Sequence, residues 1–387
     1  MTFINVQGYT TFTGYVKDKA SNAISGATVL IADSYGYILG YTSTSSSGYY
    51  SFSVSLSGHS PYYLSASKTG YETGTKTVTG GGRNDFSLYG YVDGYVKDSQ
   101  NVAISGATVK AYRYSGVLGS TTTQSNGYYY IQIANHPTKI TAEKHGFRDY
   151  SQTISTTGRF NFNMKALKAI IVGISDYSSG TDLNYCDEDA SDWYDQLDDL
   201  GYDCEIYGDG HPGNYPRYDG LATESNVRSA IQSLDTNVGS GDTVCFIFSG
   251  HGGTSWFQQY LLMQDNSKYK ETEIEDDFED FDSGVDIFFF FDSCNSGGII
   301  SSLDDMPNED YIYVATTCTK DGYGYDSPTH SNGLWTYYFL EYSWIDNYSG
   351  SRSTSMETVF DYALSNYPLG GDDTPQEHDG SASSFYL

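Results

Sequence analysis

The apolar and polar positions of this 387-residue chain follow two different patterns. In residues 12–164, short segments such as Ser51–Leu56 alternate apolar and polar side chains and lie between turns rich in Gly, Ser and Asn. Alternation is typical of strands that bury one face in a core. Strand signals about every ten residues predict small antiparallel β-sandwiches, and we assign no catalysis to them.

The alternating region contains an internal repeat. Gly14–Asp18 recurs as Gly94–Asp98, and Ala23–Val29 recurs as Ala103–Val109. Two copies of this length predict two domains, residues 1–89 and 90–164. The repeated pattern resembles the carboxypeptidase regulatory-like (transthyretin-like) sandwich family. This resemblance implies spacers or binding platforms, which would bind a surface partner or cover the region that follows.

From residue 165 onward the pattern changes to continuous apolar runs that alternate with helical spacing. Lys168–Ile174 is such a run, and Ala190, Trp193 and Leu197 then recur at helical intervals. Unbroken apolar strands are typical of parallel sheets covered on both faces. Residues 165–387 are therefore predicted to form a three-layer α/β domain with a mostly parallel sheet.

Two of these apolar runs end in turns that carry reactive side chains. Phe246–Phe248 leads into S-G-H-G-G at 249–253, and Phe288–Phe291 leads into D-S-C-N-S-G-G at 292–298. The carboxyl ends of neighbouring parallel strands lie at one edge of a sheet, so we expect His251 and Cys294 to meet there. An imidazole beside a thiol is a base beside a nucleophile. The glycines leave room for a substrate backbone and expose N–H groups for an oxyanion.

Charge is distributed very unevenly along the chain. Residues 1–164 carry 8 acidic and 12 basic residues, whereas residues 165–387 carry 41 and 8. The acidic half suits cationic partners, and it argues against nucleic acid as a ligand. No stretch reaches the roughly 20 apolar residues that a membrane span needs.

All five cysteines lie in the acidic half, and their odd number and spacing favour neither a disulfide framework nor a zinc site. The abundance of Tyr, Ser, Thr and Gly favours an extracellular or cell-surface location. The cytoplasm is the alternative, because the first residues lack the features of a signal peptide.

The two reactive turns resemble the catalytic signature of the caspase-like (clan CD) cysteine peptidases, which include metacaspases, legumains and gingipains. The resemblance covers residues 165–387. It implies an endopeptidase in which Cys294 is the nucleophile and His251 the general base and acid. The backbone amides of Gly252 and Cys294 would form the oxyanion hole. Hydrolysis through a thioester in this family requires no cofactor.

The residues around the reactive turns also predict which substrates are cleaved. Asp292 lies two residues before Cys294, on the same face of the strand end. The resemblance to metacaspases implies that Asp292 and Asp189, with Cys186 and Ser249, line the S1 pocket for Arg or Lys. A buried carboxylate pair is unfavourable unless a cation joins it, so proteins and peptides with basic residues are the expected substrates.

Two other interpretations remain open. Ala315–Thr317 resembles the equivalent stretch of legumains, which would imply cleavage after Asn. A third interpretation is an adhesion or binding protein in which the sandwiches act and the peptidase-like domain is catalytically silent.

The segment Thr272–Asp280 resembles the metacaspase stretch that includes calcium ligands. Clustered carboxylates suit Ca²⁺, and Asp276 and Asp277 are the candidate ligands. A solvated acidic start of a helix is the equally weighted alternative.

Overall fold

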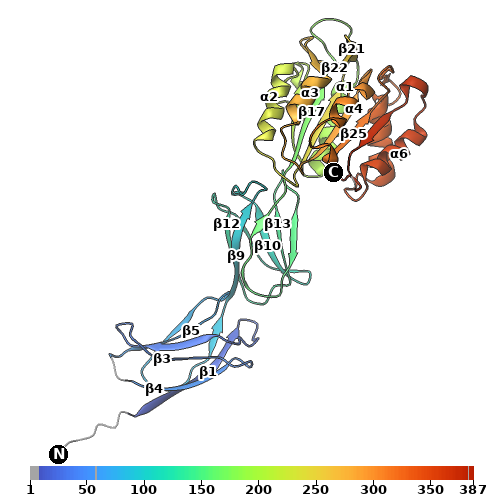
Figure 1. The fold of residues 1–387 in the computed structure, drawn as a ribbon. Coiled ribbons are helices and arrows are strands. Elements are labelled where there is room, and N and C mark those ends of the chain that lie inside the picture. Colours follow the sequence, from blue (N-terminus) through green and yellow to red (C-terminus); the bar gives the residue numbers. More distant parts are fainter. Residues whose placement is uncertain (1–7, 57–58, 382) are drawn as a thin grey trace, which may run out of the picture. The chain divides into compact units, whose positions relative to one another are not determined.

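The computed structural model describes residues 8–56, 59–381 and 383–387 (Figure 1). These residues fall into two compact units. The first unit carries the two repeats up to Met164. The second carries the region from Lys165 onward, together with the short segments Asp98–Asn101 and His145–Arg148. No helix among the described residues is long and apolar enough to cross a membrane.

The first repeat is a sandwich of two sheets, with strand orders β4-β1-β7 and β3-β2-β5-β6. Its strands are antiparallel neighbours, except that β7 and the short strand β8 run parallel to β1. Alternate residues of β2 and β5, among them Val29, Ile31 and Leu64, are fully buried between the sheets. The strands are β1 (Tyr9–Asp18), β2 (Thr28–Ala32), β3 (Ile38–Ser43), β4 (Tyr49–Ser55), β5 (Tyr62–Ser67), β6 (Gly74–Val78), β7 (Gly82–Arg83) and β8 (Phe86–Leu88).

The second repeat has the same design, with orders β12-β9-β15 and β11-β10-β13-β14 and with β16 also on β9. Its last short strands, β15 and β16, run parallel to β9, as β7 and β8 do to β1. The sequence repeat is therefore a repeat of strand topology. The strands are β9 (Gly90–Lys97), β10 (Thr108–Arg113), β11 (Gly116–Thr122), β12 (Tyr128–Ile133), β13 (Lys139–Glu143), β14 (Tyr150–Thr153), β15 (Gly158–Arg159) and β16 (Phe162–Asn163).

The second unit is built on a seven-stranded sheet of order β19-β18-β17-β20-β24-β25-β28. All neighbours are parallel except β28, which runs antiparallel to β25 at one edge. Every residue of β20 is buried, as expected for a central strand covered on both faces. The strands are β17 (Leu167–Gly173), β18 (Asp203–Gly208), β19 (Gly220–Leu221), β20 (Thr243–Ser249), β24 (Asp286–Asp292), β25 (Ile312–Thr316) and β28 (Gln376–Asp379).

Helices cover both faces of this sheet and enclose two aromatic cores. Apolar side chains of α2, α3 and α4 pack on one face, and those of α1, η4 and α6 pack on the other. The three layers predicted from the sequence are thus confirmed. The helices are α1 (Cys186–Asp199), α2 (Glu224–Asp235), α3 (Glu271–Phe278), α4 (Ile300–Asp304), α5 (Leu334–Thr336), the π-helical η4 (Tyr337–Asn347) and α6 (Met356–Asn366).

Short elements connect the layers. The hairpin strands β21 and β22 follow directly on the turn after β20, and β23 completes their small sheet. The short strands are β21 (Gly252–Ser255), β22 (Gln258–Leu262), β23 (Lys268–Lys270), β26 (Asp326–Ser327) and β27 (Asn332–Gly333). The 3₁₀ turns are η1 (Pro212–Asn214), η2 (Ser296–Gly298), η3 (Glu309–Tyr311) and η5 (Gly371–Asp373).

Candidate active site

The ends of β20 and β24 bring the two reactive turns together. Ser249 and Asp292 are the last paired residues of these parallel neighbours, and the Gly250 N–H donates to the Asp292 carbonyl at 3.2 Å. His251 and Cys294 each follow two residues later. Gly252 lies so close to the Cys294 carbonyl that a side chain there would overlap it. Both reactive residues therefore extend from one edge of the sheet.

His251 and Cys294 line the same small pocket, which has a volume of about 40 Å³. This volume holds about three water molecules. The lining contains acidic, hydroxyl and thiol groups but no lysine or arginine in the described part of the chain. The lining residues are Leu183, Cys186, Ser249, Gly250, His251, Asp292, Ser293, Cys294, Gly324, Tyr325, Asp326 and Gly333.

His251 is oriented by contacts with the loop after β17. Its Nε2 lies 2.7 Å from the Thr181 carbonyl oxygen, and the His251 N–H donates to the Tyr177 hydroxyl at 2.7 Å. A carbonyl only accepts, so Nε2 carries the proton and Nδ1 is left as the basic nitrogen. Within the described residues no hydrogen bond joins His251 to Cys294. Catalytic contacts often tighten only when substrate binds.

Cys294 is half-buried, and its Sγ lies 3.8 Å from the Gly324 carbonyl oxygen. Burial raises the pKa of the Cys294 thiol, and the negative charge of Asp292 adds to this effect. The resting group is therefore the neutral thiol, which needs a base at the moment it attacks.

Asp189 and Asp292 are both buried and lie side by side, Asp292 in the pocket wall and Asp189 behind it. A side chain at Gly333 would overlap both carboxylates. Asp189 accepts from the Ser249 hydroxyl at 2.5 Å and the Gly333 N–H at 2.8 Å. Asp292 accepts from the Thr336 N–H at 2.9 Å and the Thr336 hydroxyl at 3.1 Å. All of these donors are neutral.

The proximity of the carboxyls changes their acidity. Burial raises the pKa of Asp189 well above its ordinary value, and the charge of Asp292 raises it further. Burial likewise raises the pKa of Asp292 to about 6, with a contribution from Asp326. Two such groups without a cation favour retention of a proton, and a cation in the pocket would reverse this.

Of the residues that the sequence assigned to the site, five line the pocket: Cys294, His251, Asp292, Cys186 and Ser249. Asp189 lies one layer behind them, joined to the wall through Ser249. Gly252 lies against the Cys294 carbonyl but outside the lining. The Cys294 N–H makes no backbone hydrogen bond to another described residue.

Sequence reasoning missed several residues that shape the site. Asp326 lines the pocket and accepts from the Asn184 N–H at 2.8 Å. Gly333 has no side chain and so leaves room for the two carboxylates, and the Thr181 backbone carbonyl accepts a hydrogen bond from His251 Nε2. The irregular loops around these residues have no apolar periodicity to reveal them. Tyr177 differs, because it lies just after the first apolar run, and its position there could have suggested a place at the edge of the sheet.

Asp276 and Asp277 do not form one ligand set for calcium. Asp277 is buried, and its carboxylate lies 2.7 Å from the Arg228 Nε and accepts from the Tyr269 hydroxyl at 2.8 Å. Asp276 is exposed. Since an arginine already occupies the Asp277 carboxylate, the residues do not fit a calcium ion as they stand, and bound calcium stays a prediction.

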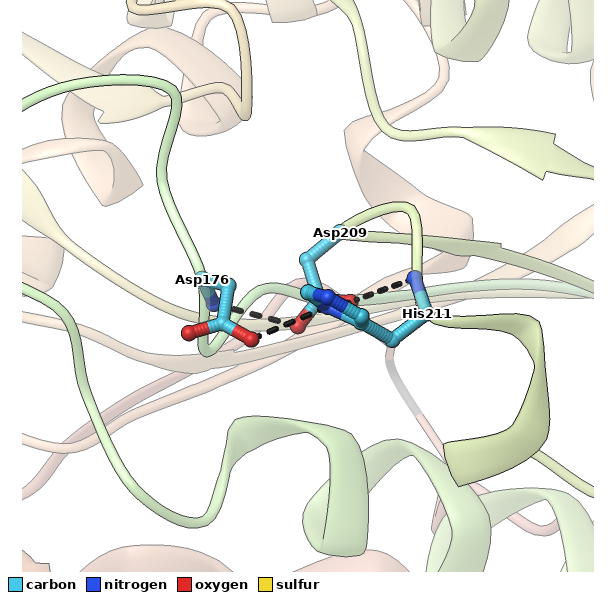
Figure 2. A group of neighbouring side chains, drawn as sticks. All are labelled: Asp176, Asp209 and His211. Carbon is cyan, nitrogen blue, oxygen red and sulfur yellow. Dashed lines mark hydrogen bonds and ion pairs between the residues drawn. The ribbon is translucent and has the colours of Figure 1, made fainter.

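A different group, Asp176, Asp209 and His211, has its potential ligand atoms within 4.8 Å of one another (Figure 2). The His211 Nδ1 lies 2.9 Å from Asp176 and 3.3 Å from Asp209. The buried Asp209 carboxylate also accepts backbone N–H groups of Ser175, Asp176 and His211. The hydrogen bonds and ion pairs of these groups are made within the cluster and to the backbone, so the cluster by itself gives no argument for a bound metal.

Comparisons with known proteins agree with this geometry. The model of the caspase domain family matches residues 166–361, just over half of the chain. The model of the carboxypeptidase regulatory-like domain matches residues 11–88 and 91–165. The search of curated proteins found no match.

Among solved structures, the chain is similar to a crystal structure of a protein from Geobacter sulfurreducens. The two are 18% identical over 55% of this chain and 92% of the other, with a TM-score of 0.43. A likeness of this size adds no argument. The match of the family model does, and together with the fold it shows that the chain belongs to the caspase-domain family, with two carboxypeptidase regulatory-like domains preceding its clan CD cysteine-peptidase domain.

Proposed function

We propose that the chain is a cysteine endopeptidase that cleaves after Arg or Lys. The observation that carries the proposal is the pocket itself. It joins a thiol and an imidazole to a buried carboxylate and has no lysine or arginine in its described lining. A guanidinium or ammonium group of a substrate would offset the unpaired carboxylates Asp292 and Asp189.

The proposed catalytic cycle uses these two side chains as nucleophile and base. The Cys294 sulfur attacks the carbonyl carbon while His251 Nδ1 takes the thiol proton. The oxyanion is stabilised by the backbone N–H groups of Gly252 and Cys294. His251 then returns the proton to the leaving amine as the C–N bond breaks, which leaves a thioester. Water, deprotonated by His251, hydrolyses the thioester and regenerates the thiol.

The position of Thr181 supports the role given to His251. Its carbonyl oxygen holds the proton on Nε2, so that the same imidazole nitrogen can accept and return the proton in both half-reactions. A backbone carbonyl thus orients the imidazole of His251, as the third side chain of a catalytic triad would.

The pocket favours basic residues over Asn at P1. An amide would leave the Asp189–Asp292 pair without a compensating charge, whereas a cation lowers the pKa of both carboxyls. An extracellular location, and a role of the sandwiches in binding a partner or covering the catalytic domain, stay predictions.

The test is a panel of fluorogenic peptides that differ only in having Arg, Lys, Asn or Asp before the cleaved bond. We expect turnover of the Arg and Lys peptides, and a loss of at least about a thousandfold in Cys294→Ala. Cys204→Ala, a matched change in the buried β18, should keep most of the activity. Undiminished turnover in Cys294→Ala would remove the assignment. Absence of alkylation at Cys294 by an Arg chloromethyl ketone would favour the silent binding protein.

A further inference from the structure

The hairpin that follows His251 ends in an unusual turn. β21 and β22 pair up to Ser255 and Gln258, so only Trp256 and Phe257 form the turn between them. Their φ angles are 52° and 71°. Positive φ at both central residues defines the type I′ turn, which matches the twist of a hairpin but strongly favours Asn and Gly. Two bulky aromatic residues in this conformation are strained.

The same two side chains are the most exposed large hydrophobic groups among the described residues. Trp256 is 92% exposed and Phe257 is 96% exposed. Neither contributes to a core, and both occupy a turn for which their backbone is poorly suited. Strain combined with exposed apolar surface is typical of a position kept for binding rather than for folding.

Phe257 forms part of the wall of a groove of about 650 Å³. Thr254 and Gln259 of the hairpin continue that wall, and Gly297 and Gly298 belong to the wall formed by the turn after Cys294. Trp256 is not part of the lining, although it occupies the same turn. The two aromatic residues therefore differ in what they face.

The groove and the carboxylate pocket are lined by neighbouring stretches of the chain around Cys294. The pocket is lined by Asp292, Ser293 and Cys294, whereas the groove begins at Gly297, three residues farther along the chain. Three residues span at most about 11 Å. Asn295 connects the turn to the far wall of the groove, because its side-chain amide donates to the Lys320 carbonyl at 2.9 Å.

We propose that this groove binds the part of a protein substrate that follows the cleaved bond, and that Phe257 packs against a large apolar or aromatic side chain there. The inference rests on the proposed function. If the residue before the bond occupies the carboxylate pocket, the residues after it must leave on the other side of Cys294. An extended peptide advances about 3.3 Å per residue, so the second or third residue beyond the bond reaches the groove.

The charges around the groove define its partner further. Glu271, Asp321 and Glu377 line it, and Lys320 is the one basic residue in the part of the lining that the structure describes. Burial raises the pKa of Glu271 and of Glu377, so added positive charge would be favourable there. The preferred sequence after the bond is therefore an aromatic residue with a basic neighbour.

The experiment uses two internally quenched peptides that share an identical segment ending in Arg. After the bond the two peptides differ only at the second position, which is Phe in one and Gly in the other, and neither carries Arg or Lys there. We expect the full-length chain to favour the first about tenfold in kcat/KM, the size of one aromatic contact. In Phe257→Ala the preference should fall to about twofold or less, whereas Trp256→Ala should keep at least about half of it.

A double variant separates the lost contact from a disrupted hairpin. Trp256→Asn with Phe257→Gly installs the residues that a type I′ turn favours, so the melting temperature should not fall. The aromatic preference should nevertheless disappear. An unaltered preference in this variant or in Phe257→Ala would overturn the proposal, as would the lack of any preference in the unaltered chain.

A binding measurement distinguishes failure of this inference from failure of the proposed function. Fluorescein-labelled forms of the two peptides are titrated with full-length Cys294→Ala, which does not need to turn over. The aromatic peptide should bind about tenfold more tightly, and the added Phe257→Ala change should remove the difference. Equal binding of both peptides would reject the groove even if cleavage after Arg is observed. If neither peptide is cleaved by the unaltered chain, the endopeptidase proposal fails and the titration still decides what the groove binds.

Discussion

Buried carboxylates in the α/β unit occur in two different settings, one with a cation from the chain beside it and one without. On α3, Asp277 pairs with Arg228 of α2, whose Nε lies 2.7 Å from its carboxylate. At the end of β24, Asp292 and its neighbour Asp189 accept, among the described residues, only from hydroxyl and backbone N–H groups. The first group contains its own cation, and the second does not.

This difference separates carboxylates that stabilise the fold from carboxylates that are available to a ligand. An ion pair completed within the chain leaves little for a ligand to gain, and breaking it is costly. Carboxyls that are buried together without a cation have raised pKa values and gain from a positive charge that arrives from outside. In a chain with 49 acidic residues, a buried carboxylate alone therefore does not identify a binding pocket. The distinguishing feature is whether the chain itself supplies the cation that pairs with it.

The largest expected effect compares the same chemical change in the two groups. Asp292→Asn should lower kcat/KM for a peptide with Arg before the bond by about a thousandfold, since one partner of a buried charge pair is lost. Asp277→Asn should leave it within about threefold. The measurement is steady-state hydrolysis by variants whose folding is verified by circular dichroism. An equal loss in both variants would erase the distinction.

The next effect tests the cation that is built into the chain. Arg228→Met should destabilise the second unit by about 3 kcal/mol, because Asp277 is left buried without its partner. Arg217→Met is the control, since Arg217 is more exposed and pairs with the partly exposed Asp219. That change should be worth less than about 1 kcal/mol. Urea unfolding measures both, and similar values would contradict the contrast.

The smallest effect concerns pH. The pKa of Asp292 is raised from 3.8 to about 6 in the folded chain, so the folded state retains a proton that the unfolded state has released between these values. Stability is therefore lost as pH rises through this window. The stability that Asp292→Asn gains over the unaltered chain should be about 2 kcal/mol larger at pH 7.5 than at pH 4. Calorimetry at the two pH values measures this, and a gain that does not depend on pH would exclude the titration.

The edge of the sheet from which His251 and Cys294 extend could be predicted because its signals are local. Val244–Phe248 in β20 and Ile287–Phe291 in β24 are unbroken apolar runs, and a Gly-rich turn follows each strand. The start of α2 is also marked locally, because Thr223 and Ser225 are both residue types that cap helices and lie on either side of Glu224. The structure selects Thr223, whose side chain accepts from the Asn226 N–H.

The remaining features depend on contacts that no local pattern encodes. Arg228 and Asp277 come from different helices, and no periodicity joins them. The carbonyl that holds His251 comes from Thr181, but any residue type could supply it. Strand β28 (Gln376–Asp379) is polar on both faces, so it lacks the alternation by which an edge strand is recognised.

The pairing of Ser249 with Asp292 has a consequence for how this protein can diverge. Because the sheet sets the positions of His251 and Cys294, the segment between β22 and β24 can grow or shrink by insertion without separating them. The two-residue steps from Ser249 to His251 and from Asp292 to Cys294 have no such freedom. Relatives should therefore vary in length inside the first segment and be invariant in length across both steps.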